Sequence, residues 1–399
     1  MKEFINSQDD DEENEEDLIQ KPEIYDQAVI WGTDWTTETV ISQLKRKNID
    51  LFPKFQRRDA WSKASKSKFI ESLILGLPVP QIILAEKKDK RGSYIVIDGK
   101  QRLLTLRQFF SDQPDDEFTP LKLSSLKVLT KLNGKSIKHL EKDPIYNQYY
   151  TQLINQTIRT VVIKNWPDES FLFTVFLRLN TGSIKLSPQE LRQALHPGEF
   201  IDFADTFSIE SDQIKKMLKL KEPDYRMRDV EIVIRFFTYK YFIEDYNGNL
   251  KAAFDNTVKI LNNDWEIRQE NVRKEAENLN SSIEATFDIF GNDDAFSKWN
   301  GDGFQGNFNR AIFDIMTYYF SNPIIADKAK NNKNGVTNAF KMLCETDSDF
   351  LASFEHTTKS IHNTEKRFYT WGKILSEVLN LRIDVPYLLD NNKFALKTL

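Results

Sequence analysis

Two kinds of apolar pattern divide the chain. Before residue 200, residues 81–86 (QIILAE) and 93–98 (SYIVID) are short apolar runs on either side of a polar, glycine-containing connector, and residues 157–163 (TIRTVVI) form a third run. Short runs bounded by turn residues predict strands, and the first two together predict a β-hairpin. Beyond residue 200 the apolar positions recur at helical spacing, as in 229–246 and 308–320, and no segment there predicts a strand.

Local start and stop signals predict helices between these strands. Ser62 precedes an apolar stripe that Gly76 ends, and this predicts a helix between the two. Ser187, Pro188 and Glu190 form a capping box with proline at the first helical position, which predicts a second helix start. The fold class that follows is α+β, in which a mixed α/β N-terminal domain precedes an all-helical C-terminal domain.

The charge distribution separates the N-terminus from the rest. Residues 1–20 carry nine acids and one lysine within a chain of net charge −5. Removing that lysine from the 55 Lys and Arg, and the nine acids from the 60 Asp and Glu, leaves about +3 for the remainder. An acidic block without apolar periodicity predicts a disordered tail. The predicted organisation is therefore a tail at 1–22, an α+β domain at 23–200 and a helical domain at 201–399.

Composition excludes several classes of protein. One cysteine and four histidines leave no disulfide scaffold and no cysteine-rich metal site. No run of 18 apolar residues predicts a membrane span, and the N-terminus has neither a signal-peptide nor a transit-peptide pattern. We therefore expect a cytoplasmic protein. The phosphate-binding motifs G-x-x-x-x-G-K-[ST] and G-x-G-x-x-G are both absent from the sequence.

The strongest candidate for chemistry is IDGKQR at residues 97–102. The predicted strand ends at Asp98, Gly99 allows a sharp turn, and the next residues begin a predicted helix whose free amides favour an anion. Lys100 and Arg102 add positive charge near that helix start. The pattern fits a phosphate-sized site, and it also fits a plain strand-to-helix turn with a solvated Arg102.

Two weaker segments carry further polar residues. Gln56 and Arg57 lie in an extended, aromatic-flanked stretch, where they suit either a phosphate ligand or a basic surface patch. Asn180 and Thr181 break one predicted helix shortly before the next begins. That turn exposes amides and hydroxyls, but an ordinary helix–helix connector explains it as well.

Four motifs in a fixed order resemble a known family. They are QRR-x-x-W (56–61), KFIESLILGLPVPQIIL (68–84), IDGKQRLLTL (97–106) and FLRLNTGSIKLSPQELR (176–192). Together they resemble the N-terminal domain family of GmrSD-type modification-dependent restriction enzymes. The resemblance implies a ParB/sulfiredoxin-like core with a helical extension, in a stand-alone form because no His-Asn-His nuclease motif follows. The family's Asp-Gly-Gln-Gln-Arg pattern falls on residues 98–102, with Lys100 where a glutamine is typical, and Ser183 stands where a second glycine is frequent.

The resemblance also implies an activity. It implies binding of a nucleoside triphosphate with Mg²⁺, and hydrolysis as in characterised members. The catalytic residues would be Asp98, Gln101 and Arg102, with Asp98 also the metal ligand; the nucleotide-binding residues would be Gln56, Arg57, Gly99, Lys100, Arg178, Asn180 and Thr181.

The function that follows is a prokaryotic defence protein that senses DNA or regulates a nuclease subunit supplied in trans. Two alternatives stay open. One is a DNA-binding module with nucleotide as a non-hydrolysed effector. The other is a self-sufficient modification-dependent DNA endonuclease.

Overall fold

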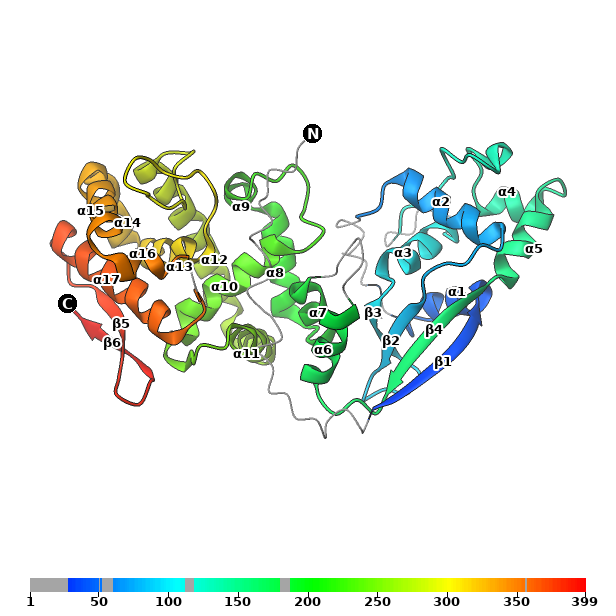
Figure 1. Cartoon of the computed structure of the whole chain (residues 1–399), viewed down its shortest axis with the longest axis horizontal. Coiled ribbons are helices and arrows are strands. Elements are labelled where there is room, and N and C mark those ends of the chain that lie inside the picture. Colours follow the sequence, from blue (N-terminus) through cyan, green and yellow to red (C-terminus); the bar gives the residue numbers. More distant parts are fainter. Residues whose placement is uncertain (1–27, 50, 52–59, 112–117, 180–186, 356) are drawn as a thin grey trace. The chain divides into compact units, whose positions relative to one another are not determined.

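The structure is a computed structural model that describes residues 28–49, 51, 60–111, 118–179, 187–355 and 357–399. The predicted acidic tail lies outside these residues. Two compact units make up the described chain, and the boundary between them falls after Leu195. The fold is mixed α+β, as the sequence predicts, with the larger sheet in the N-terminal unit (Figure 1). No helix in the described ranges is long and apolar enough to cross a membrane.

The N-terminal unit is built on a four-stranded sheet. Its spatial order is β1-β4-β2-β3, and the strands are β1 (Val29–Thr36), β2 (Ile82–Glu86), β3 (Tyr94–Asp98) and β4 (Thr157–Lys164). The β2–β3 pair is antiparallel, which confirms the predicted hairpin, and β4 confirms the strand predicted at 157–163. Strand β4 is parallel to β2 and antiparallel to β1. Strand β1 lies at the edge of the sheet, and the sequence did not predict it.

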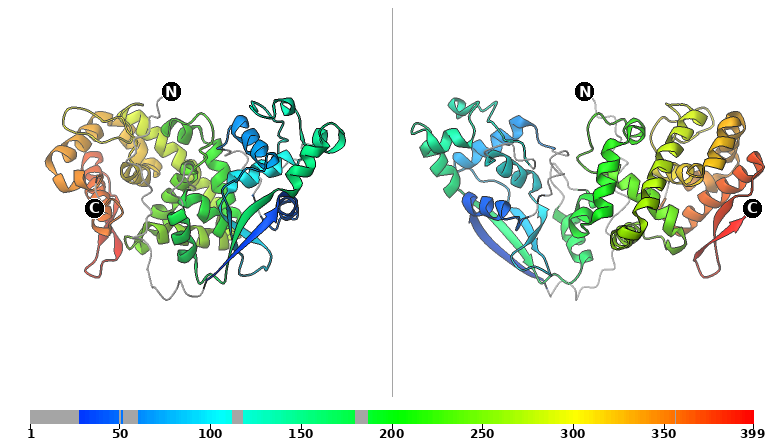
Figure 2. Two further views of the ribbon diagram at one scale, coloured as in Figure 1. Left: turned by 45° about the vertical axis from the view of Figure 1, so that its right-hand side comes forward. Right: turned by 180° about the vertical axis from the view of Figure 1, so that it is seen from behind.

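Side-chain alternation in the central strands gives the sheet two apolar faces. Ile82 and Leu84 belong to one buried cluster, whereas Ile83 and Ala85 belong to the other. The first cluster packs helices α1 (Thr37–Lys45), α2 (Lys63–Ile74), α3 (Lys100–Phe109), α4 (Ile137–Lys142) and α5 (Asn147–Asn155), with the short 3₁₀ helix η4 (Thr130–Leu132). The second packs α6 (Glu169–Leu179) and α7 (Pro188–Leu195) (Figure 2). The sheet is thus the middle layer of three.

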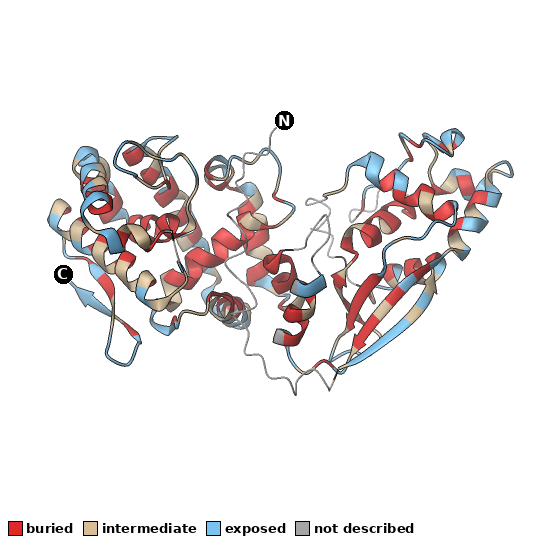
Figure 3. Cartoon of the chain, in the orientation of Figure 1, coloured by how far each residue is buried: buried red, intermediate tan, exposed pale blue. Residues whose placement is uncertain are grey.

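The second unit is mostly helical. Its helices are α8 (Glu199–Glu210), α9 (Asp212–Met217), α10 (Arg228–Phe242), η5 (Ile243–Asp245), α11 (Leu250–Asn263), α12 (Trp265–Phe290), α13 (Arg310–Phe320), α14 (Pro323–Asn331), α15 (Lys333–Thr346), α16 (Ser348–Ala352) and α17 (Ile361–Leu379). Figure 3 shows their inward faces as buried. The apolar stripes at 229–246 and 308–320 are the buried faces of α10 and α13.

The prediction that this region is all-helical is wrong at its end. Strands β5 (Asp384–Leu388) and β6 (Phe394–Thr398) form an antiparallel hairpin. Pro386 interrupts the first of these runs, and proline within a run argues against a strand in a sequence. The hairpin is held by packing, because Val385 and Phe394 are buried.

Candidate anion-binding site

The turn between β3 and α3 is the centre of the candidate site. Asp98 is the last residue of β3, and Gly99 follows in the left-handed region with φ +98° and ψ +13°. Gly99 occupies the N-cap position of α3 and offers no side-chain acceptor to the first amides of the helix. Free amides at a helix start, together with the helix dipole, attract an anion.

Space as well as backbone conformation requires glycine at this turn. A Cβ atom on residue 99 would lie 3.1 Å from Nη2 of Arg102 and 3.2 Å from Cγ1 of Ile82. Both contacts are tight, and a positive φ of this size is strained for any other residue. Gly99 therefore lets the Arg102 guanidinium lie directly against the turn.

Asp98 and Arg102 form an ion pair at the start of the helix. Nη2 of Arg102 donates to Oδ2 of Asp98 at 2.8 Å. The Arg102 side chain is 10% exposed and that of Asp98 is 40% exposed, so the alternative in which Arg102 is solvated does not hold. Nε of Arg102 is buried and has no hydrogen-bond partner among the described residues. Because a guanidinium carries five donors, the pair leaves Arg102 able to bind a phosphate as well.

Lys100 binds the carboxylate of Glu190 on α7. Its ammonium nitrogen lies 2.5 Å from Oε1 of Glu190, and both side chains are 6% exposed. Oε2 of Glu190 accepts a hydrogen bond from the Ser187 amide at 2.8 Å, and the Glu190 amide donates to the Ser187 hydroxyl at 3.2 Å. The predicted capping box is confirmed, and its carboxylate also neutralises Lys100. Lys100 thereby ties the start of α3 to the start of α7.

Further buried polar atoms lie on residues beside this pair. Oε1 of Gln101, Nε2 of Gln189 and Oε1 of Gln193 are buried and have no hydrogen-bond partner within the described ranges. Buried amide groups in folded proteins are nearly always paired, so such atoms favour a bound water or ligand nearby. The sequence analysis did not single out Gln189, Glu190 or Gln193 as site residues, because they read as an ordinary helix start.

Only one of the other predicted site residues lies in the part of the chain that the structure describes. Arg178 lies near the end of α6 and is exposed. Gln56, Arg57, Asn180 and Thr181 lie outside the described residues. The described chain contains no group of three or more His, Cys, Asp or Glu residues that could hold a metal ion. A Mg²⁺ ion at Asp98 would therefore take its remaining oxygen ligands from phosphates and water, which is usual for this ion.

These features define a strand–turn–helix site with an Arg–Asp pair at the helix start. Residues 38–197, which contain it, match the family model described as the GmrSD restriction endonuclease, N-terminal domain. This match supports the assignment of residues 38–197 to the GmrSD N-terminal domain family, and it confirms the resemblance noted from the four motifs. The match covers less than half of the 399 residues. No curated protein matches the chain significantly.

Proposed function

We propose that this chain is a restriction-type defence protein whose N-terminal domain binds a nucleoside triphosphate with Mg²⁺ at the β3–α3 turn. The family match supports the defence role. The observation that carries the binding proposal is the position of Arg102, which is buried at the start of α3 beside Asp98 and whose Nε has no hydrogen-bond partner in the described part of the chain. A phosphate there would meet both the helix amides and a charged donor.

In this proposal each residue of the turn has a distinct role. The Gly99 turn and the first amides of α3 bind phosphate oxygens, and Arg102 neutralises their charge. Oδ1 of Asp98 accepts no hydrogen bond from the described residues, and the side chain is 40% exposed. Asp98 can therefore take Mg²⁺ or orient the attacking water. Lys100 holds the turn to α7, because its charge is neutralised by Glu190.

The remaining predicted residues complete the pocket in this proposal. Gln101 orients the water or the phosphate beside Asp98. Gln56, Arg57, Arg178, Asn180 and Thr181 supply further contacts to the nucleotide from two other segments. Hydrolysis of a phosphoanhydride depends mainly on positioning and charge neutralisation, which such a cluster provides. The turnover would regulate a nuclease subunit in trans or report the presence of DNA.

Calorimetric titration with ATP, GTP, CTP and UTP, with and without Mg²⁺, tests binding. Arg102→Ala removes a charge-assisted hydrogen bond of about 1.5–3 kcal/mol. Affinity should therefore fall roughly ten- to hundredfold. Arg159→Ala is the matched control, because Arg159 pairs with Asp34 at the surface, where the two side chains are 58% and 54% exposed. Wild-type protein that binds none of the four nucleotides rules the proposal out.

Phosphate release separates hydrolysis from binding. Asp98→Ala should keep part of the nucleotide affinity and abolish turnover, because an acid at this place serves metal or water more than phosphate. If wild type binds but never hydrolyses, the effector-module alternative replaces the NTPase. The endonuclease alternative would require this chain alone to cleave modified DNA.

A further inference from the structure

Strand β1 forms one edge of the sheet in the N-terminal unit. All of its residues, Val29–Thr36, pair with β4 on the inner side. In the described part of the chain no strand or bridge pairs with its outer side. The strand at the opposite edge, β3, is partly covered, because Tyr94 forms a bridge with Ile49 and its amide donates to the Asn48 carbonyl at 2.7 Å. An edge such as that of β1 offers its amides and carbonyls to a further strand.

The first half of β1 is apolar as well as exposed. Val29, Ile30 and Trp31 are 49%, 69% and 52% exposed, and Figure 3 shows most of the strand as exposed. Edge strands that stay unpaired are commonly protected by lysine or proline, and β1 contains neither. Strand β6 of the C-terminal hairpin, in contrast, carries the exposed Lys397. Strand β1 therefore lacks the usual protection against pairing with another chain.

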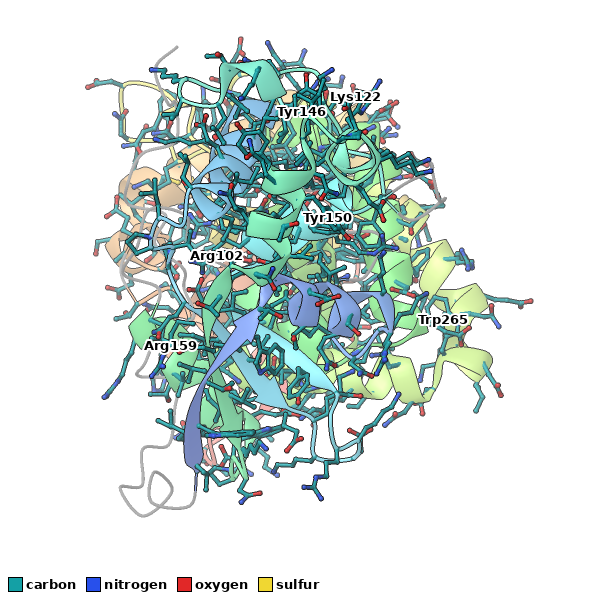
Figure 4. All side chains as sticks on the ribbon, turned by 90° about the vertical axis from the view of Figure 1, so that its right-hand side faces the viewer. Arg102, Lys122, Tyr146, Tyr150, Arg159 and Trp265 are labelled. Carbon is teal, nitrogen blue, oxygen red and sulfur yellow. The ribbon has the colours of Figure 1, made fainter. Side chains whose placement is uncertain are left out.

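The only charged residue of β1 has a partner on β4. Nη1 of Arg159 donates to Oδ1 of Asp34 at 3.2 Å. Nη2 of Arg159 lies over Gly32, where a Cβ atom would be 3.0 Å from it. The guanidinium thus fills the side-chain space that glycine leaves open, on the same face of the sheet as Asp34. Figure 4 views the N-terminal unit from this side and labels Arg159.

Symmetry restricts how this edge can pair with a second copy of itself. Two identical edge strands related by a two-fold axis run antiparallel, and residues opposite each other point to the same face of the joint sheet. The axis must therefore pass through a residue of β1 and not between two residues. When it passes through Thr33, Gly32 lies opposite Asp34 of the second copy. In the same register Trp31 lies opposite Trp35 of the second copy.

This register is complementary in charge and in side-chain type. Because Arg159 lies over Gly32, its guanidinium faces Asp34 of the second copy as well as its own Asp34. The tryptophans form two cross-strand aromatic pairs and Thr33 meets its own copy, and both kinds of pair stabilise antiparallel strands. An axis through Gly32 places the apolar Ile30 opposite the acid instead. We infer that the chain forms a homodimer in which two β1 strands pair antiparallel about Thr33 and join the sheets of two N-terminal units.

The inference does not rest on nucleotide binding, because β1 and β3 lie at opposite edges of the sheet. One pair of strands is a small interface, so the association should depend on protein concentration. Sedimentation velocity of the full chain over a concentration series measures it. Hydrogen exchange gives a second readout, in which the amides of β1 exchange more slowly as concentration rises and those of β3 do not change.

The decisive test places like charges on the two-fold axis. In Thr33→Lys, and separately in Thr33→Glu, each new side chain opposes an identical charge, so self-association should weaken roughly tenfold or more. An equimolar mixture of the two variants should restore the dimer, because lysine then faces glutamate. The matched control is Ile145→Lys, which adds the same charge at an exposed apolar residue of the same unit and should dimerise like wild type.

Three results would overturn the inference. Wild type that stays monomeric at every concentration would leave the edge to a strand of another protein. A dimer that Thr33→Lys weakens no more than Ile145→Lys does would place the interface elsewhere on the chain. A mixture of the two Thr33 variants that stays monomeric, although each variant melts like wild type, would exclude a two-fold axis at this residue.

Discussion

Lys100 and Glu190 form a buried ion pair at 2.5 Å although 90 residues of sequence separate them. Each residue lies in the first turn of its own helix, and Glu190 uses its second oxygen to cap that helix. One carboxylate thus joins a local capping motif to a long-range contact. Breaking such a pair on one side leaves a buried charge without compensation.

The first prediction isolates this charge. In Glu190→Gln the amide can still complete a capping box, so the change mainly removes the negative charge that faces the buried Lys100 ammonium. We expect the free energy of unfolding of the N-terminal unit to fall by about 3–5 kcal/mol. Hydrogen exchange across α3 and α7, with urea unfolding, measures the loss. Asp34→Asn breaks the exposed pair with Arg159 and should cost less than about 1 kcal/mol; equal losses would contradict the argument.

The second prediction concerns the space at Gly99. Gly99→Ala adds a Cβ atom against Arg102 and Ile82 as well as a strained φ of +98°. Gly92→Ala has a similar φ of +77° but meets nothing within 4 Å, so it measures the backbone strain alone. We expect Gly92→Ala to cost about 1–2 kcal/mol and Gly99→Ala to cost more, with weaker nucleotide affinity in Gly99→Ala alone. Indistinguishable melting curves for the two variants would show that the turn accommodates a Cβ atom at residue 99 without a steric conflict.

The third prediction tests a charged network in the helical unit. Asp314 on α13 accepts hydrogen bonds from Arg235 at 2.5 and 2.7 Å, and Arg367 on α17 donates to it at 3.4 Å. All three residues are buried. Asp314→Asn leaves two buried guanidinium groups without their shared carboxylate, so we expect a loss of stability of about 3–5 kcal/mol.

Calorimetric melting and hydrogen exchange in α10, α13 and α17 check this expectation. Asp264→Asn is the control, because Asp264 pairs with Arg268 at 3.0 Å where both side chains are about 40% exposed. Its effect should stay below about 1 kcal/mol. A loss in Asp314→Asn no larger than in this control would mean that the network contributes little.

The fourth prediction uses the single cysteine of the chain. Burial raises the pKa of the Cys344 thiol to about 12. Because the folded state holds this proton more tightly than the unfolded state, the associated stability is complete below the unfolded pKa of about 8.5 and is lost as pH rises toward 12. At pH 8 iodoacetamide should therefore label Cys344 only as the helical unit opens. Mass spectrometry across a urea series measures this, and rapid labelling of native protein would contradict it.

Local signals predicted much of the fold. The helix starts at Ser62 and Ser187 are confirmed, because in each case the side-chain oxygen accepts a nearby amide hydrogen bond. Strand β1 was missed because its residues are largely exposed, contain Gly32 and show no apolar alternation. Strand β1 is stabilised by its pairing with β4, and a local sequence pattern cannot predict a partner strand so distant in sequence.

In the candidate site, too, the local features were predictable from the sequence and the long-range contacts were not. The strand end at Asp98 and the turn at Gly99 follow from a local pattern, and the sequence placed both. The burial of Arg102 and the partner of Lys100 depend on how α3 packs on the sheet and how α7 packs against β3. The capping box explained Glu190 completely at the local level, so nothing in the sequence pointed to its second role.

The sheet order has a consequence for synthesis on the ribosome. Val29 pairs with Lys164, so β1 has no partner until β4, some 135 residues later, has left the exit tunnel. At typical elongation rates of about 5–20 residues per second, that delay is on the order of ten seconds. During it the nascent chain presents Ile30 and Trp31 on an unpaired strand, and both remain more than half exposed even after folding. Translation speed between these strands, and the chaperones that meet the emerging chain, thus bear directly on the yield of native protein.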